Sequence, residues 1–152
     1  MKLAEALLNR GTLQSKINEL RTRLSNNAVV QEGESPAESP RELLSQMNAA
    51  FAELETLMTK INLTNASLVY EGRTMTQMLA QRECLRDKLS AYRSFLNEAS
   101  MTGRRSRGSE IKIISTVPVA DIQKDIDKKS QELRKLEIKI QELNWITDLK
   151  ED

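Results

Sequence analysis

Apolar side chains recur along the chain at alternating steps of three and four residues, which is the spacing of a coiled-coil seam. The pattern is clearest toward the end of the sequence, where Lys129 takes the one interrupted step. The apolar members there are Val119, Ile122, Ile126, Leu133, Leu136, Ile140 and Leu143. Such a ridge is stable only when it is removed from water, so it predicts packing against other helices.

Three earlier stretches repeat this spacing. With the last one they predict four helices, over about 2–25, 40–65, 74–99 and 118–143. Glycine and proline lie in the connections or at helix starts, with the exception of Gly11. Local residue chemistry and periodicity therefore agree on the same four segments.

The second predicted helix has a wider apolar face than the others. Besides its seam it carries a parallel row formed by Leu44, Phe51 and Met58. A face wider than one seam is typical of a helix with more than one neighbour. We therefore expect this helix to contact two others and to be the most buried.

The connections contain three short runs with β propensity, and we expect short strands at about 28–31, 67–70 and 110–117. If the helices run up and down, the first and third runs lie at one end and can pair, whereas 67–70 meets the segment after the last helix. The predicted fold class is mainly α. It has four long helices in an antiparallel bundle or coiled coil, short β segments at the connections, and a single domain over 1–152. The alternative is a long open coiled-coil hairpin.

Composition supports a helical protein without a dominant charge. Aromatic residues make up only 3% of the 152 residues, so the core must come from Leu, Ile, Met and Val. Charged residues make up 30% but nearly cancel at +1, which gives no strong nucleic-acid signal. No stretch approaches the roughly 20 apolar residues of a transmembrane segment, and no secretory signal is readable. We expect a soluble cytoplasmic protein.

The residue types needed for common catalytic sites are missing. The chain has no histidine and one cysteine, and it contains no phosphate-binding glycine loop or nucleophile motif. No catalytic, cofactor-binding or metal-binding residues are predicted, and the chain is not expected to be an enzyme. The charges that interrupt the seams, at Arg10, Arg82 and Lys129, are typical of register control.

Two features are candidate interaction sites. Ile138 and Trp145 lie seven residues apart, opposite the seam of the last helix, and a large indole there favours a second contact surface, either between subunits or under a capping strand. The alternative is a pair of scattered surface apolar residues. The run from 103 to 108 carries Arg104, Arg105 and Arg107, which can contact an anion such as phosphate or RNA. No aromatic stacking platform accompanies these arginines, so a solvated loop is the simpler interpretation.

Cys84 is a candidate redox-sensitive thiol because Arg82, Arg86 and Lys88 lie close to it in the sequence and favour a thiolate. The alternative is an inert cysteine. A single cysteine provides no second thiol within the chain to resolve an oxidised sulfur.

Four stretches, in this order, resemble a family of small uncharacterised bacterial helical proteins. They are MKLAEALLNRGTLQSKINELRTRL, NAVVQEGESPAE, INLTNASLVYEGRTMTQMLAQRE and IQELNWITDL, and together they cover most of the chain. Some members carry the label septicolysin, which implies an oxygen-labile haemolysin. The resemblance supplies no catalytic or binding residues.

The leading functional hypothesis is a non-enzymatic helical protein that forms a homo-oligomer and acts as a scaffold or interaction module. One alternative is a septicolysin-like membrane-active toxin, whose amphipathic helices would insert into lipid. The other is a weak polyanion or RNA binder that uses the basic run at 103–108.

Overall fold

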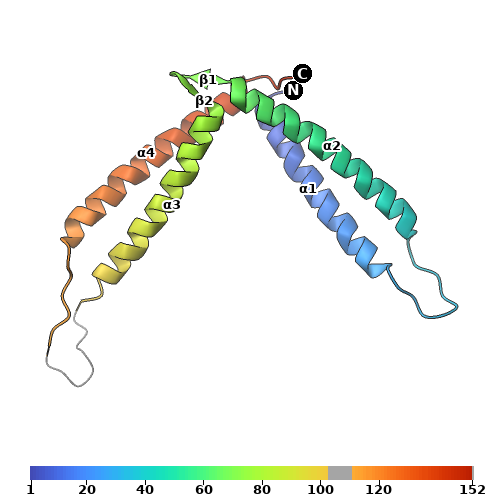
Figure 1. Cartoon of the computed structure of the whole chain (residues 1–152), viewed down its shortest axis with the longest axis horizontal. Coiled ribbons are helices and arrows are strands. Elements are labelled where there is room, and N and C mark those ends of the chain that lie inside the picture. The colour runs from blue at the N-terminus through green and yellow to red at the C-terminus, as the bar shows by residue number, and fades with distance from the viewer. Residues whose placement is uncertain (103–110, 152) are drawn as a thin grey trace. The chain divides into compact units, whose positions relative to one another are not determined.

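The structure is a computed structural model that describes residues 1–102 and 111–151. It confirms a mainly α fold with four helices and one small hairpin (Figure 1). The elements are α1 (Leu3–Asn26), α2 (Pro40–Ser67), β1 (Val69–Tyr70), β2 (Arg73–Thr74), α3 (Met75–Ala99) and α4 (Val119–Ile146). The helix bounds lie close to those expected from the periodicity, and α4 continues furthest beyond its expected end, to Ile146.

The described chain divides into two compact units. Unit 1 comprises Met1–Thr74 together with Glu142–Asp152, and unit 2 comprises Met75–Gln141. The expectation of a single domain over 1–152 stays a prediction.

In unit 1, α1 and α2 run antiparallel and bury their seams against each other (Figure 1). One buried cluster lies along the middle of the pair and the other at the end where the chain begins. The first contains Leu13, Ile17, Ala50 and Leu54, and the second contains Leu3, Ala6, Ile61 and Leu149. Leu57 packs against both clusters, so the apolar contact is continuous along the pair.

The connection between α1 and α2 is held by polar contacts. The buried Asn27 amide donates to the Arg23 carbonyl oxygen at 2.9 Å, and its side-chain oxygen accepts from the Glu38 backbone N–H at 2.9 Å. Arg23 also donates two hydrogen bonds to the Glu38 carboxylate. The expected strand at 28–31 is wrong, because these residues lie in this loop and form no strand.

The two ends of the chain pair with each other in unit 1. The Leu3 N–H donates to the Thr147 carbonyl at 2.9 Å, and the Leu149 N–H donates to the Met1 carbonyl at 2.9 Å. The segment after α4 also reaches the end of α2, where the Lys150 N–H donates to Thr64 Oγ1 at 2.9 Å. The expected approach of this segment to the 67–70 region is present, whereas the pairing of the two chain ends was not predicted.

The strand expected at 67–70 is present in shorter form as β1, which pairs antiparallel with β2. Their turn places Glu71 at φ 48° and Gly72 at φ 77°. Two successive positive φ values are typical of a tight hairpin turn that glycine favours in its second central position.

The run expected as a strand at 110–117 is described from residue 111 onward, and there it contains a single bridge residue, Lys112. Its expected partner run at 28–31 forms no strand. A short strand persists only when a neighbour satisfies its backbone hydrogen bonds, and two β-prone runs separated by some 80 residues carry no local signal for such pairing.

In unit 2, α3 runs antiparallel to the part of α4 that ends at Gln141 (Figure 1). The apolar seam of α3 buries Met75, Met78, Leu85 and Leu89, and α4 buries Ile126, Leu136 and Ile140. Arg86 Nη2 contacts Glu137 Oε1 at 2.6 Å, which links the two helices beside this seam. The seam charge Lys129 lies 4.7 Å from the Tyr92 ring centroid, so a cation–π contact accommodates it.

The expectation that α2 is the most buried helix is wrong. Its seam packs on α1, but the row of Leu44, Phe51 and Met58 remains 38–45% exposed. Periodicity showed that this row is apolar, but it could not show that a second helix would cover it.

Candidate functional site

The surface of α2 between Leu44 and Leu63 is poor in charge. Fourteen of its side chains between Leu44 and Leu63 are exposed, and only Glu53 and Glu55 among them are charged. In α4, by contrast, nine of the sixteen exposed positions carry a charge. Dense charge keeps an exposed helix face solvated, so this part of α2 differs from α4 in lacking that protection.

Twelve of the fourteen side chains cover one continuous side of the helix, and we call this set the α2 outer face. It consists of Leu44, Ser45, Asn48, Ala49, Phe51, Ala52, Glu55, Thr56, Met58, Thr59, Asn62 and Leu63. Glu55 is its single charge. Small residues allow another backbone to approach closely, and the four large apolar side chains supply area that gains from burial.

The apolar row of this face has heptad spacing. Leu44, Phe51 and Met58 are seven residues apart, so they stay on one side of the helix with only a small drift. The Arg21 guanidinium of α1 lies 5.8 Å from the Phe51 ring centroid. One side of this ring is therefore contacted within unit 1, while the row as a whole remains accessible.

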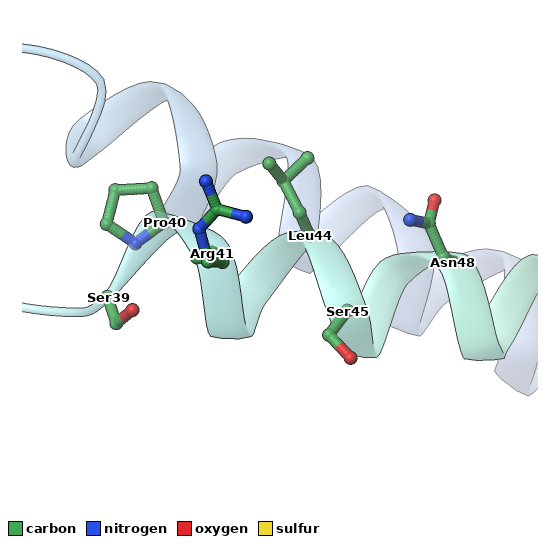
Figure 2. Close-up of a pocket in the computed structure, with 6 residues that line it drawn as sticks. All are labelled: Ser39, Pro40, Arg41, Leu44, Ser45 and Asn48. Carbon is green, nitrogen blue, oxygen red and sulfur yellow. The ribbon is translucent and has the colours of Figure 1, made fainter.

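The first turns of α2 show how the local sequence positions the face. Ser39 caps the helix by accepting a hydrogen bond from the Glu42 N–H at 3.4 Å, and Pro40 occupies the first helical position. Figure 2 shows that Arg41, Leu44 and Asn48 rise from the same side of the helix, while Ser45 points elsewhere. This is the geometry expected for residues three, four and seven positions apart.

Two shallow hollows lie along α2. The first, of about 690 Å³, is lined by Ser39, Pro40, Arg41, Leu44, Ser45 and Asn48 (Figure 2). The second, of about 580 Å³, borders the C-terminal segment, where Lys60 Nζ contacts Glu151 Oε2 at 2.7 Å. Both are open depressions on a helix surface, so they suit a docked side chain or helix better than an enclosed small molecule.

The perturbed ionisable groups mark ion pairs at the edges of unit 1. Hydrogen bonds from Arg23 hold the pKa of the Glu38 carboxyl below its usual value. Lys2 lowers the pKa of Asp148 in the same way, through a hydrogen bond and its charge. These pairs are exposed and lie outside the α2 outer face, so they indicate structural contacts rather than a catalytic site.

The described residues contain neither a grouped set of metal ligands nor a helix suited to a membrane. Within 1–102 and 111–151, no three acidic or cysteine side chains gather into a group that could hold a metal ion. Over the same ranges, none of the helices combines the length and apolar character needed to cross a membrane.

The candidate site residues from the sequence that the structure describes lie on α3 and α4. Ile138 belongs to unit 2 and Trp145 to unit 1, and both are more than half exposed. Cys84 is an exposed free thiol on α3. Its expected activating neighbours Arg82 and Arg86 are engaged with carboxylates of Glu83 and Glu137. All three interpretations stay predictions.

The basic residues Arg104, Arg105 and Arg107 lie outside the described residues. The sequence identified the row of Leu44, Phe51 and Met58 but not the uncharged surface around it. The signal for that surface is a run of small and uncharged residues between the seam positions of 40–65, in a chain that is 30% charged overall.

Comparison with other proteins places the whole chain among proteins of unknown function. The family of unknown function DUF6847 matches residues 10–149. The crystal structure of a functionally unknown conserved protein from Corynebacterium diphtheriae is 37% identical in sequence and similar with a TM-score of 0.92, over 99% of both chains. No curated protein is detectably similar. Both matches are described as functionally unknown, and neither description uses the septicolysin label.

Proposed function

The chain belongs to the DUF6847 family of unknown function, and we propose that it is a non-catalytic protein that binds helices and self-associates through the α2 outer face. The observation that carries this proposal is the composition of that face, which has twelve exposed side chains and one charge. An exposed helix with this composition is typical of helix-in-groove or helix-on-helix recognition.

The physical driving force is burial of the apolar row. Leu44, Phe51 and Met58 keep 38–45% of their surface in water although each belongs to a helix that is otherwise well packed. Covering apolar surface is worth about 25 cal/mol per Å². Contiguous exposed apolar surface rimmed by polar residues is a feature of interaction sites.

The role as a scaffold in the cytoplasm is part of the same proposal. It is supported by the single exposed cysteine, Cys84, which has no intrachain disulfide partner in this sequence. A septicolysin-like activity is the competing function, and it predicts that the purified protein releases dye from liposomes. Leakage that depends on reductant would replace our proposal.

The test of self-association is the molar mass in solution by light scattering over a dilution series. We expect a mass above the 17.3 kDa of one chain at high concentration, falling toward that value on dilution. Phe51→Glu should shift the equilibrium to the monomer. The matched control is Leu8→Glu, which places the same charge at an exposed leucine of α1.

Circular dichroism should show that both variants keep their helix content. A wild-type mass of one chain at every concentration would contradict the proposal. So would equal effects of Phe51→Glu and Leu8→Glu, because the association would then not depend on the α2 outer face.

A further inference from the structure

We propose that the α2 outer face pairs with the same face of a second copy, with the two helices antiparallel about a two-fold axis near Asn48. This inference rests on the proposed self-association and adds the orientation, the register and the residues that select them. In this arrangement Arg41 meets Glu55 of the second copy, and Leu44 meets Phe51 of the second copy.

The spacing along α2 carries the register. Arg41 and Glu55 lie seven residues before and after Asn48. Leu44 and Phe51 lie four before and three after it, so they match the same centre to within one residue. In a two-fold antiparallel helix pair, residues at equal distances on opposite sides of the axis face each other. The face is therefore complementary to itself when its direction is reversed.

The charges decide between orientations. Arg41 and Glu55 are both exposed, and within the described parts of the chain neither forms an ion pair. A parallel two-fold pair would place Arg41 against Arg41 and Glu55 against Glu55, which is repulsive. The antiparallel pair replaces these like contacts with two opposite ones, so the charges favour one orientation and oppose the other.

Self-complementarity also argues for a second copy as the occupant. A different protein would need to supply both a matching apolar ridge and charges in reverse order, whereas a second copy carries them already. The α2 outer face stays accessible for it, since Arg41, Leu44 and Asn48 rise together from one side of the helix (Figure 2).

The size of the face sets the expected strength. In this register eight of the twelve side chains, those from Leu44 to Thr56, lie opposite the second α2. They are about a third of the roughly 20 to 30 residues that each partner contributes to a standard interface. We therefore expect a dimer that dissociates on dilution, with a Kd on the order of micromolar.

The test exchanges the two charges. Arg41→Glu and Glu55→Arg should each raise the dimer Kd by about tenfold or more, because each creates two like-charge contacts per dimer. The double variant R41E/E55R should return the Kd to within about threefold of wild type. An equimolar mixture of R41E with E55R should form a heterodimer at concentrations where each alone is monomeric.

The matched control is Glu53→Arg. Glu53 is an exposed carboxylate of the same helix, but two residues correspond to a rotation of about 200° around the axis, so it lies far from the Glu55 row. This variant should leave the Kd unchanged. Helix content by circular dichroism should be equal in all variants.

Two outcomes would overturn the inference: charge reversals that match Glu53→Arg, or a mixture of R41E and E55R that does not associate. If Phe51→Glu still abolishes the dimer in that case, the α2 outer face remains the interface and only the register is wrong. If Phe51→Glu also has no effect, the proposed function fails as well.

Discussion

Replacement of Leu149 by alanine tests whether the chain ends stabilise unit 1. Leu149 lies near the C-terminus, yet it is only 7% exposed and packs in a cluster with Leu3, Ala6 and Ile61. Its backbone N–H also donates to the Met1 carbonyl. Removing the side chain therefore takes away an apolar contact shared by both chain ends and α2.

The magnitude follows from the burial. Truncating a buried leucine to alanine costs about 2–5 kcal/mol, depending on how far the surroundings relax. A segment close to the chain end can relax more than a helix interior, so we expect about 2–3 kcal/mol. For a chain of this size each 1 kcal/mol lowers the Tm by about 2–4 °C, which gives a decrease of about 4–12 °C.

The assay is urea and thermal unfolding followed by circular dichroism, with Ile146→Ala as the matched control. Ile146 lies three residues earlier and is 61% exposed, so its truncation should change stability by less than about 0.5 kcal/mol. The reasoning is refuted if the two variants unfold alike, because Leu149 would then contribute no more than a surface side chain.

Three further predictions concern local features. Gly11→Ala should raise the free energy of unfolding by about 0.5–1 kcal/mol, since Gly11 lies inside α1 and no atom would crowd an added methyl group. A variant that unfolds at a lower urea concentration than wild type would contradict this. Glu38, whose pKa is held below its ordinary 4.5 by Arg23, should stabilise the fold above pH 4.5 and lose this contribution as pH falls through the lower folded-state pKa. The Tm difference between wild type and Glu38→Gln should therefore narrow toward low pH, and a constant difference would argue against the ion pair. The exposed Cys84 should react with a thiol reagent without unfolding, in a 1:1 ratio; protection until denaturant is added would show that it is buried.

The four helices were predictable because each carries its own signals. A seam with alternating steps of three and four residues can be recognised without knowing which helix it packs against. Ser39 followed by Pro40 predicts the start of α2 from local residue chemistry alone. Contacts between distant segments have no such signal. Leu149 is a single apolar residue after the last periodic stretch, so nothing in its neighbourhood indicates that it completes a cluster with Leu3.

For the α2 outer face the sequence reveals the apolar row but not whether the row is covered within the chain. The row of Leu44, Phe51 and Met58 was recognised from the sequence, but an apolar row predicts burial without saying whether the same chain provides the cover. In the structure α1 covers the seam and leaves the row exposed. Charge content separates this side of α2 from a solvated helix surface. The α2 outer face has almost no charge, whereas α4 carries charge at most of its exposed positions. Helix α2 thus retains, after unit 1 has folded, the same kind of unburied ridge that drives helices together within the chain, and in the proposed dimer a second copy supplies a matching one.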